Sequence, residues 1–188
     1  PVGARGDANP LQGHVRHALG FGASQSGRVL RDFLHQGFNQ DLQGRAVFDA
    51  VMPVIAGSRR AFLNMPFSQP GRFSRQHEDH DFPGDQFPFA YGLQHDPLSG
   101  QTDGILRRAE AAGVSPKLMH LDSDSEFYSA RSSLVITDGE GQDAVLPENV
   151  RFYLASSVAH VDDALPQEVA TAPGNGLTYA SLARALIE

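Results

Sequence analysis

A strand that runs directly into a tight, glycine-rich turn and then into a helix is the feature that most limits how this chain folds. His14–Phe21 has the apolar content of a strand and leads straight into Gly22-Ala-Ser-Gln-Ser-Gly27. The residues that follow carry apolar side chains at helical spacing, which predicts a helix of about ten residues that ends near Gly37. A strand, a sharp turn and a helix in this order predict one unit of an α/β fold.

Strands and helices alternate along the rest of the chain. Apolar runs rich in Val, Ile and Leu predict further strands at Ala46–Ile55, Lys117–Leu121 and Val150–Ala155. Apolar periodicity predicts further helices at Ile105–Ala112, Tyr128–Ile136 and Thr178–Leu186. Because parallel neighbours need crossover connections, this alternation predicts a single α/β domain over residues 1–188, with a mostly parallel sheet flanked by helices. We expect the ligand at the carboxyl ends of the strands.

Residues 58–103 differ in character from the flanking segments. They are irregular in pattern and rich in proline and phenylalanine, which predicts a lid-like insertion over the site. The phenylalanines are able to line an apolar acyl or alcohol pocket, but packing within the insertion is the favoured role for most of them. These residues are Phe62, Phe67, Phe73, Phe82, Phe87 and Phe89.

The charge and the composition exclude several classes of partner. The formal net charge is -7 and no run of Lys or Arg exceeds a pair, so we expect no nucleic-acid partner. No apolar run approaches the roughly 20 residues of a membrane span. The chain has no cysteine, which excludes disulfides, thiolate metal sites and cysteine nucleophiles.

Ser24 is the candidate nucleophile. An acyl-transfer serine needs a strained strand-to-helix turn, with small residues two positions away on either side. Gly22 and Ser26 occupy these positions around Ser24, whereas a nucleophile at Ser26 would be flanked by Arg28, which is far too large. We therefore predict Ser24 as the nucleophile and the backbone N–H of Gln25 as one oxyanion donor, at the positive end of the following helix.

His160 is the candidate base, because a serine nucleophile needs a histidine that is itself held by a carboxylate. His160 follows the last predicted strand, which completes the chain order serine, acid, histidine, whereas His120 would lie within a strand. Three acids, Asp122, Asp124 and Glu126, follow the Lys117–Leu121 strand. Spacing alone does not separate these three acids.

A competing interpretation assigns a metal site to the segment that contains His77, Glu78, Asp79, His80 and Asp81. Alternating acids and histidines are suitable ligands for calcium or zinc. However, a zinc-binding helix needs histidines four residues apart, and these two are three apart in a stretch without helical periodicity. A solvated charged loop is favoured, so we expect no metal. A metal-binding or non-catalytic binding module on an incomplete scaffold is the alternative function.

Several strings in the chain carry a family likeness: Gly22–Asn39, Val47–Asp49, Ala56–Gly57, Gln86–Tyr91, Pro116–Lys117, Ser125–Tyr128 and Val150–Tyr153. They resemble a largely uncharacterised bacterial family of α/β-hydrolase domain proteins, over about residues 14 to 160, and Ser-Gln-Ser-Gly-Arg is the most specific string. The resemblance implies a carboxylic ester hydrolase, or a related acyl hydrolase, that needs no cofactor. It also implies that the acid is Glu126. Family members commonly have Trp where Tyr128 stands. This difference does not affect the assignment of Glu126 as the acid.

The resemblance also leads us to expect that strands are missing. Members of this fold have several strands before the nucleophile, and one of those earlier loops provides the second oxyanion donor. We therefore expect the chain to be the C-terminal half of an α/β-hydrolase fold that lacks the N-terminal strands. An unpartnered sheet edge invites association. Besides a small-molecule ester substrate, the expected partners are thus a missing N-terminal segment or another chain.

Overall fold

Four parallel strands form the centre of the structure. The computed structural model describes residues 11, 13–61, 87–160 and 179–187. The sheet has the order β1-β2-β5-β6 and every neighbouring pair is parallel. Its strands are β1 (Leu19–Ala23), β2 (Ala50–Val54), β5 (Lys117–Ser123) and β6 (Val150–Ala155). The predicted α/β class with a mostly parallel sheet is confirmed.

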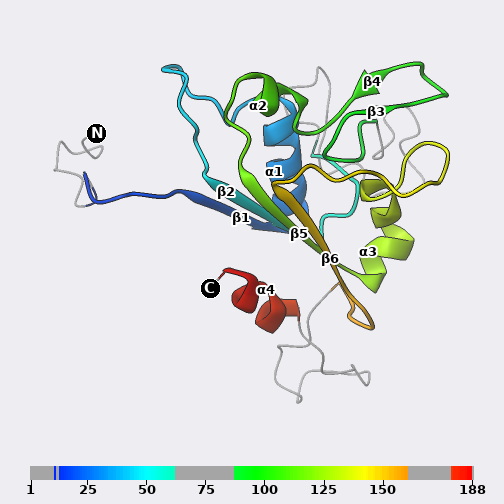
Figure 1. Cartoon of the computed structure of the whole chain (residues 1–188). Coiled ribbons are helices and arrows are strands. Elements are labelled where there is room, and N and C mark those ends of the chain that lie inside the picture. Colours follow the sequence, from blue (N-terminus) through cyan, green and yellow to red (C-terminus); the bar gives the residue numbers. More distant parts are fainter. Residues whose placement is uncertain (1–10, 12, 62–86, 161–178, 188) are drawn as a thin grey trace, which may run out of the picture.

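Helices lie on both sides of this sheet. They are α1 (Gln25–His35), α2 (Arg107–Ala111), α3 (Asp124–Ser129) and α4 (Tyr179–Ile187). Figure 1 shows α1 and α2 on one side of the sheet, α4 on the other, and α3 directly after β5. The helices predicted after the serine turn, around Ile105–Ala112 and at Thr178–Leu186 are confirmed to within a turn. Among the described residues, no helix is long and apolar enough to cross a membrane.

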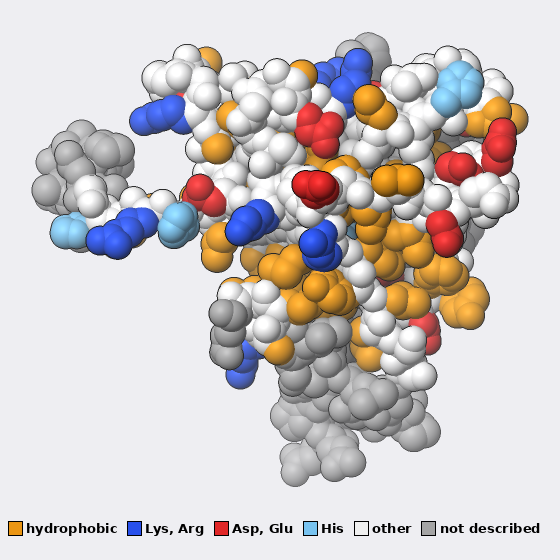
Figure 2. Space-filling model, in the orientation of Figure 1, with side chains coloured by type: hydrophobic (Ala, Val, Ile, Leu, Met, Phe, Trp, Pro, Cys, Tyr) orange, Lys and Arg blue, Asp and Glu red, His pale blue; other side chains and the backbone are white. Residues whose placement is uncertain are grey.

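The sheet separates two apolar clusters. Successive residues of a strand point to opposite faces, so Val51 packs with Leu34 of α1, whereas Met52 packs with Ala183 of α4. Figure 2 shows hydrophobic side chains gathered over the strands beside α4. Burial of each large apolar side chain contributes about 1.5–3 kcal/mol. The two clusters therefore hold α1 and α4 against opposite faces of one sheet.

The first strand is shorter than predicted, because it begins at Leu19 and not at His14. The side chains of residues 14–17 are exposed, and the N–H of Ala18 donates to the Asp49 carboxylate (2.8 Å) instead of to a neighbouring strand. Apolar content without a pairing partner does not make a strand. Within the described residues β1 lies at the edge of the sheet. Pairing of this edge with a further segment or chain stays a prediction.

The second strand is also shorter than the predicted Ala46–Ile55. Residues before Ala50 bond to Asn39 in the preceding loop: the N–H of Val47 donates to the Asn39 carbonyl (2.9 Å), and Phe48 exchanges hydrogen bonds with the Asn39 side chain. This local partner competes with the sheet for the backbone groups. The strand predicted at Lys117–Leu121 instead extends two residues further, to Ser123, and the strand at Val150–Ala155 is as predicted.

The helix predicted at Tyr128–Ile136 is wrong in its start and its continuity. The structure has α3 at Asp124–Ser129 and a separate 3-10 helix at Ser132–Val135. The helix begins early because Ser123 caps it, and it is interrupted at Arg131, whose φ of 50° is left-handed. The early start places Glu126 in the first turn of the helix, which decides its surroundings.

The proposed insertion at residues 58–103 falls partly outside the described residues. Residues 62–86 lie outside them, including Phe62, Phe67, Phe73, Phe82 and the whole string from His77 to Asp81. The remainder contains an antiparallel pair, β3 (Gln94–His95) and β4 (Thr102–Asp103). The Phe87 and Phe89 rings pack edge to face, with centroids 6.1 Å apart.

Candidate active site

Ser24 sits in a strained turn between β1 and α1. Its φ of 54° and ψ of -119° lie in a region that residues other than glycine rarely adopt. The backbone N–H of Ser24 donates to the carbonyl oxygen of Val54 on β2 (2.8 Å). This tether fixes the serine at the carboxyl end of the sheet.

Close backbone approaches explain the glycines around Ser24. A Cβ on Gly22 would lie 2.5 Å from the carbonyl oxygen of Ser26, and a Cβ on Gly27 would lie 2.9 Å from the carbonyl oxygen of Gly22. The start of α1 therefore packs onto β1 through Gly27. The side chain of Ser26 is exposed, so a serine at this flanking position causes no crowding.

A chain of side-chain hydrogen bonds links residues that are far apart in the sequence. Ser24 Oγ lies 2.9 Å from His160 Nε2, and His160 Nδ1 is hydrogen-bonded to Glu126 Oε1. The Glu126 side chain is 1% exposed, whereas that of His160 is 38% exposed. The carboxylate is thus shielded from water while the imidazole borders solvent. The structure brings together all three side chains that the sequence singled out.

The three side chains meet because three strands end at the same edge of the sheet. Ser24 follows β1, Glu126 lies just after β5, and His160 follows β6. Figure 1 shows these three strands side by side with β2 in one sheet. Gln25, the predicted oxyanion donor, is the first residue of α1. Backbone N–H groups in the first turn of a helix have no acceptor within the helix, so this one is suited to bind a developing negative charge.

Asp122 is bound to a different set of groups. Its Oδ1 accepts hydrogen bonds from the N–H groups of Ala56 (2.9 Å) and Gly57 (3.2 Å), and its Oδ2 accepts one from the Ser132 hydroxyl and lies 2.8 Å from His120 Nε2. Burial by itself raises the pKa of the Asp122 carboxyl, but His120 and the hydrogen-bond donors outweigh burial and hold this pKa below its ordinary value. Asp122 is therefore a buried carboxylate that fixes the loop after β2.

Asp124 also makes a separate contact. Its Oδ2 accepts a hydrogen bond from the backbone N–H of Ser157 (2.6 Å), in the loop between β6 and His160. Of the three acids that spacing leaves open, Glu126 is the one whose carboxylate is hydrogen-bonded to the His160 ring.

Within the described ranges, no group of three or more His, Cys, Asp or Glu side chains is arranged to hold a metal ion.

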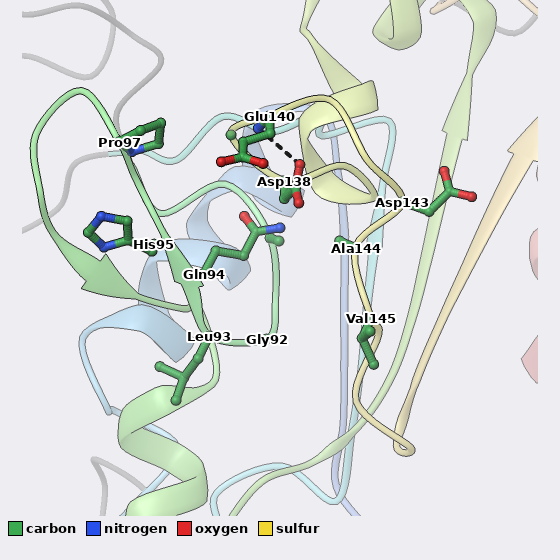
Figure 3. A pocket seen from close by; sticks show the side chains of 12 residues that line it. Gly92, Leu93, Gln94, His95, Pro97, Asp138, Glu140, Asp143, Ala144 and Val145 are labelled. Carbon is green, nitrogen blue, oxygen red and sulfur yellow. Dashed lines mark hydrogen bonds between the residues drawn. The ribbon is translucent and has the colours of Figure 1, made fainter.

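One cavity lies apart from Ser24. It has a volume of about 440 Å³ and lies between the β3 segment and the loop around Asp138. Figure 3 shows Glu140, Asp143 and His95 among its lining residues. The cavity lining includes none of Ser24, Glu126 and His160.

The model of an alpha/beta hydrolase domain family matches residues 2–184 of the chain. The chain belongs to this alpha/beta hydrolase family. Membership indicates a hydrolase, and it confirms the resemblance that the Ser-Gln-Ser-Gly-Arg string predicts. Neither the curated proteins nor the solved structures contain a match to the chain.

Sequence reasoning missed the contacts that surround Glu126 in this alpha/beta hydrolase. Ser123 and Glu126 form a capping box at the start of α3, and Ser125 accepts a hydrogen bond from the N–H of His160. The string Ser-Asp-Ser-Glu at 123–126 matches the S/T-x-x-E pattern of such a box. That signal was available in the sequence. The contact between Ser125 and His160 has no sequence signal, because the two residues belong to different elements.

Proposed function

We propose that this alpha/beta hydrolase cleaves carboxylic esters through an acyl-enzyme intermediate formed on Ser24. The observation that supports this proposal is the hydrogen-bonded chain from Ser24 Oγ to His160 Nε2, at 2.9 Å, and from His160 Nδ1 to Glu126 Oε1. A carboxylate that accepts the Nδ1 proton leaves Nε2 free to accept the serine proton. The backbone strain at Ser24 and the fully buried acid belong to the same arrangement.

The first half-reaction in this proposal forms the acyl-enzyme. Ser24 Oγ attacks the ester carbonyl carbon and passes its proton to His160 Nε2, while the backbone N–H of Gln25 donates to the oxyanion. The tetrahedral intermediate then breaks its bond to the alcohol oxygen, and His160 returns the proton to that oxygen. Glu126 stabilises the imidazolium between these two transfers.

The second half-reaction releases the acid. Water loses a proton to His160 Nε2 as its oxygen attacks the acyl carbon, and the bond to Ser24 Oγ then breaks as the serine recovers its proton from His160. The products are one carboxylic acid and one alcohol, so neither a redox partner nor a cofactor is consumed. Because the His160 ring is partly exposed, water has a route to it.

Labelling with a fluorophosphonate probe tests the nucleophile directly. We expect stoichiometric modification of the protein, located by mass spectrometry on the peptide that contains Ser24, and loss of labelling in Ser24→Ala. Ser26→Ala is the matched control, because its side chain is exposed in the same turn, and it should label normally. Equal labelling of Ser24→Ala and the wild type would refute the assignment.

Hydrolysis of p-nitrophenyl esters tests the reaction class. Esters of graded acyl length should release p-nitrophenol with saturable kinetics, and Ser24→Ala should lower kcat/KM by at least about 10³-fold. An unchanged rate in Ser24→Ala means that the ester is being cleaved elsewhere on the protein or by a contaminant.

A further inference from the structure

We propose that the first turn of α3 positions both the acid and the histidine of the proposed triad. Ser123 orients the Glu126 carboxylate, and Ser125 holds the loop that carries His160. The inference rests on the proposed function, because both serines act through the other two residues. The two serine hydroxyls bond to Glu126 and to the backbone of His160. In the proposed reaction neither hydroxyl contacts the ester, so both serines are positioning residues and not catalytic ones.

The two oxygens of the Glu126 carboxylate have different partners. Oε2 accepts a hydrogen bond from the Ser123 hydroxyl and lies 3.3 Å from the Ser123 backbone nitrogen, whereas Oε1 faces His160 Nδ1. Ser123 and Glu126 are 0% and 1% exposed, so water does not compete for these groups. A glutamate has one more rotatable bond than an aspartate, and the two donors on Oε2 remove that freedom. The helix cap therefore aims Oε1 at the histidine.

The loop that carries His160 is held by the next two residues of the same turn. Ser125 Oγ accepts a hydrogen bond from the backbone N–H of His160 (3.1 Å), and Asp124 Oδ2 accepts one from the backbone N–H of Ser157 (2.6 Å). Ser157 has a φ of 62°, which costs energy for a residue with a side chain. Hydrogen bonds at both ends of the segment 157–160 therefore fix the position of the His160 imidazole.

The register of the sheet explains why one turn reaches both groups. Ser123, the last residue of β5, is paired with Ala155, the last residue of β6. The start of α3 therefore lies beside the loop that leaves β6, and the side chains of its first turn spread over that loop. An acid placed later in the helix would lose both the cap and this neighbour.

Kinetics of four variants at position 123 and one control separate positioning from simple helix capping. Ser123→Ala and Ser123→Gly both remove the hydroxyl, but glycine is a nearly adequate N-cap. Ser123→Thr keeps the hydroxyl, and Ser123→Asn keeps a capping side chain without an O–H donor. Ser129→Ala is the matched control, because the Ser129 hydroxyl donates to the backbone carbonyl of Ser125 within the same helix and not to Glu126 or His160.

The expected kinetic result is a loss in kcat with little change in KM. Ser123→Gly and Ser123→Ala should each lower kcat about tenfold to a hundredfold, which is the usual effect of removing a residue that hydrogen-bonds to a metal-binding side chain. KM should stay within about twofold. Ser123→Thr should restore most of the rate, Ser123→Asn should not, and Ser129→Ala should match the wild type. If Ser123→Gly turns over like Ser129→Ala, or if its KM rises in step with the loss of kcat, the positioning role is overturned.

A spectroscopic measurement keeps this inference distinct from the proposed function. A proton shared between His160 Nδ1 and Glu126 should give a far-downfield proton NMR resonance that is absent in His160→Ala. We expect Ser123→Gly to broaden or remove it, and Ser129→Ala to retain it. Persistence of the resonance in Ser123→Gly contradicts the inference even if esters are cleaved. Its loss there supports the inference even if no ester tested is a substrate.

Ser125 is tested in the same way with a smaller expected effect. Ser125→Ala leaves one backbone N–H without its acceptor, while Asp124 still holds the other end of the loop. We expect kcat to fall about threefold to tenfold, less than for Ser123, because a neutral hydrogen bond contributes modestly. An Asp124→Asn, Ser125→Ala double variant should lose more than the product of the single losses. A double variant with unchanged kcat means that the turn does not position His160.

Discussion

Among the residues that the structure describes, two hydroxyl–histidine–carboxylate chains occur, and only one of them borders solvent. In the first, Ser24 bonds to His160 and His160 to Glu126. In the second, the Tyr91 hydroxyl lies 2.7 Å from His120 Nδ1, and His120 Nε2 lies 2.8 Å from Asp122. Tyr91, His120 and Asp122 are all 0% exposed.

The two chains share the same kinds of group but differ in their burial and in their partners. Burial raises the pKa of Tyr91 to about 12, so its hydroxyl stays protonated and serves as a hydrogen-bond donor. Asp122 is saturated by backbone N–H groups and by Ser132. The buried chain joins β5 to the loop after β2 and to Tyr91, whereas the Ser24 chain ends on a strained residue beside solvent.

The largest effect should come from Glu126→Gln. Glutamine keeps the capping box, but a neutral amide does not stabilise the imidazolium or hold the histidine tautomer, and kcat should fall about 10⁴-fold. Ester hydrolysis and urea unfolding of the same preparation check this, because the free energy of unfolding should change by only about 1 kcal/mol. Near-normal turnover in Glu126→Gln, together with an inactive Asp124→Asn, would assign the acid to Asp124 instead.

The next effect should be on stability, from Asp122→Ala in the buried chain. Removing this carboxylate leaves Ser132 and two backbone N–H groups without their acceptor, and it takes away the charged partner of His120. The free energy of unfolding should therefore fall by about 3–5 kcal/mol. Urea unfolding followed by circular dichroism measures the loss. A change below about 1 kcal/mol would mean that the buried chain is not structural.

A smaller effect is expected from Tyr91→Phe. The ring and its cation–π contact with Arg31, whose guanidinium carbon lies 4.9 Å from the ring centroid, are retained, but His120 Nδ1 loses its donor. The free energy of unfolding should fall by about 1–3 kcal/mol, and kcat should stay unchanged. If Tyr91→Phe loses turnover but not stability, the buried chain contributes to the activity of the Ser24 chain.

The smallest expected effect is on how the free energy of unfolding depends on pH. It comes from His35, which belongs to neither chain. His35 accepts a hydrogen bond from Arg60 on Nδ1 (2.6 Å) and bonds to Asp103 through Nε2 (3.1 Å). Burial, and then the charge of Arg60, lower the pKa of His35 below its ordinary value of 6.5. The unfolded chain therefore binds more protons than the folded one below that pH, and the free energy of unfolding falls as the pH falls from 6.5 through the lowered pKa.

His35→Gln checks this assignment, because the amide is able both to accept from Arg60 and to donate to Asp103 without titrating. Urea unfolding between pH 7 and pH 5 should show a shallower decline for His35→Gln than for the wild type. Equal slopes in the two proteins would assign the pH dependence to other groups.

The alternation of strands and helices and the position of the serine turn follow from the sequence. Apolar period and glycine placement are local properties. They predict α1 and β6 closely, and they predict β1, β2, β5 and α3 with errors at their ends. The errors in β2 and α3 have local causes. The Asn39 side chain hydrogen-bonds to the Phe48 backbone, so β2 begins only at Ala50. The cap at Ser123 starts α3 four residues earlier than the apolar period predicts.

The partners of the three acids after β5 show what the tertiary structure decided. Asp122, Asp124 and Glu126 alternate with serines over five residues, and spacing does not distinguish them. Their side chains point to the loop after β2, to Ser157 and to His160 respectively. These partners lie 33 to 66 residues away in the chain, and only the parallel pairing of β2, β5 and β6 brings them within hydrogen-bond distance. The sequence supplied the residue types and their order, and the sheet register assigned each carboxylate its partner.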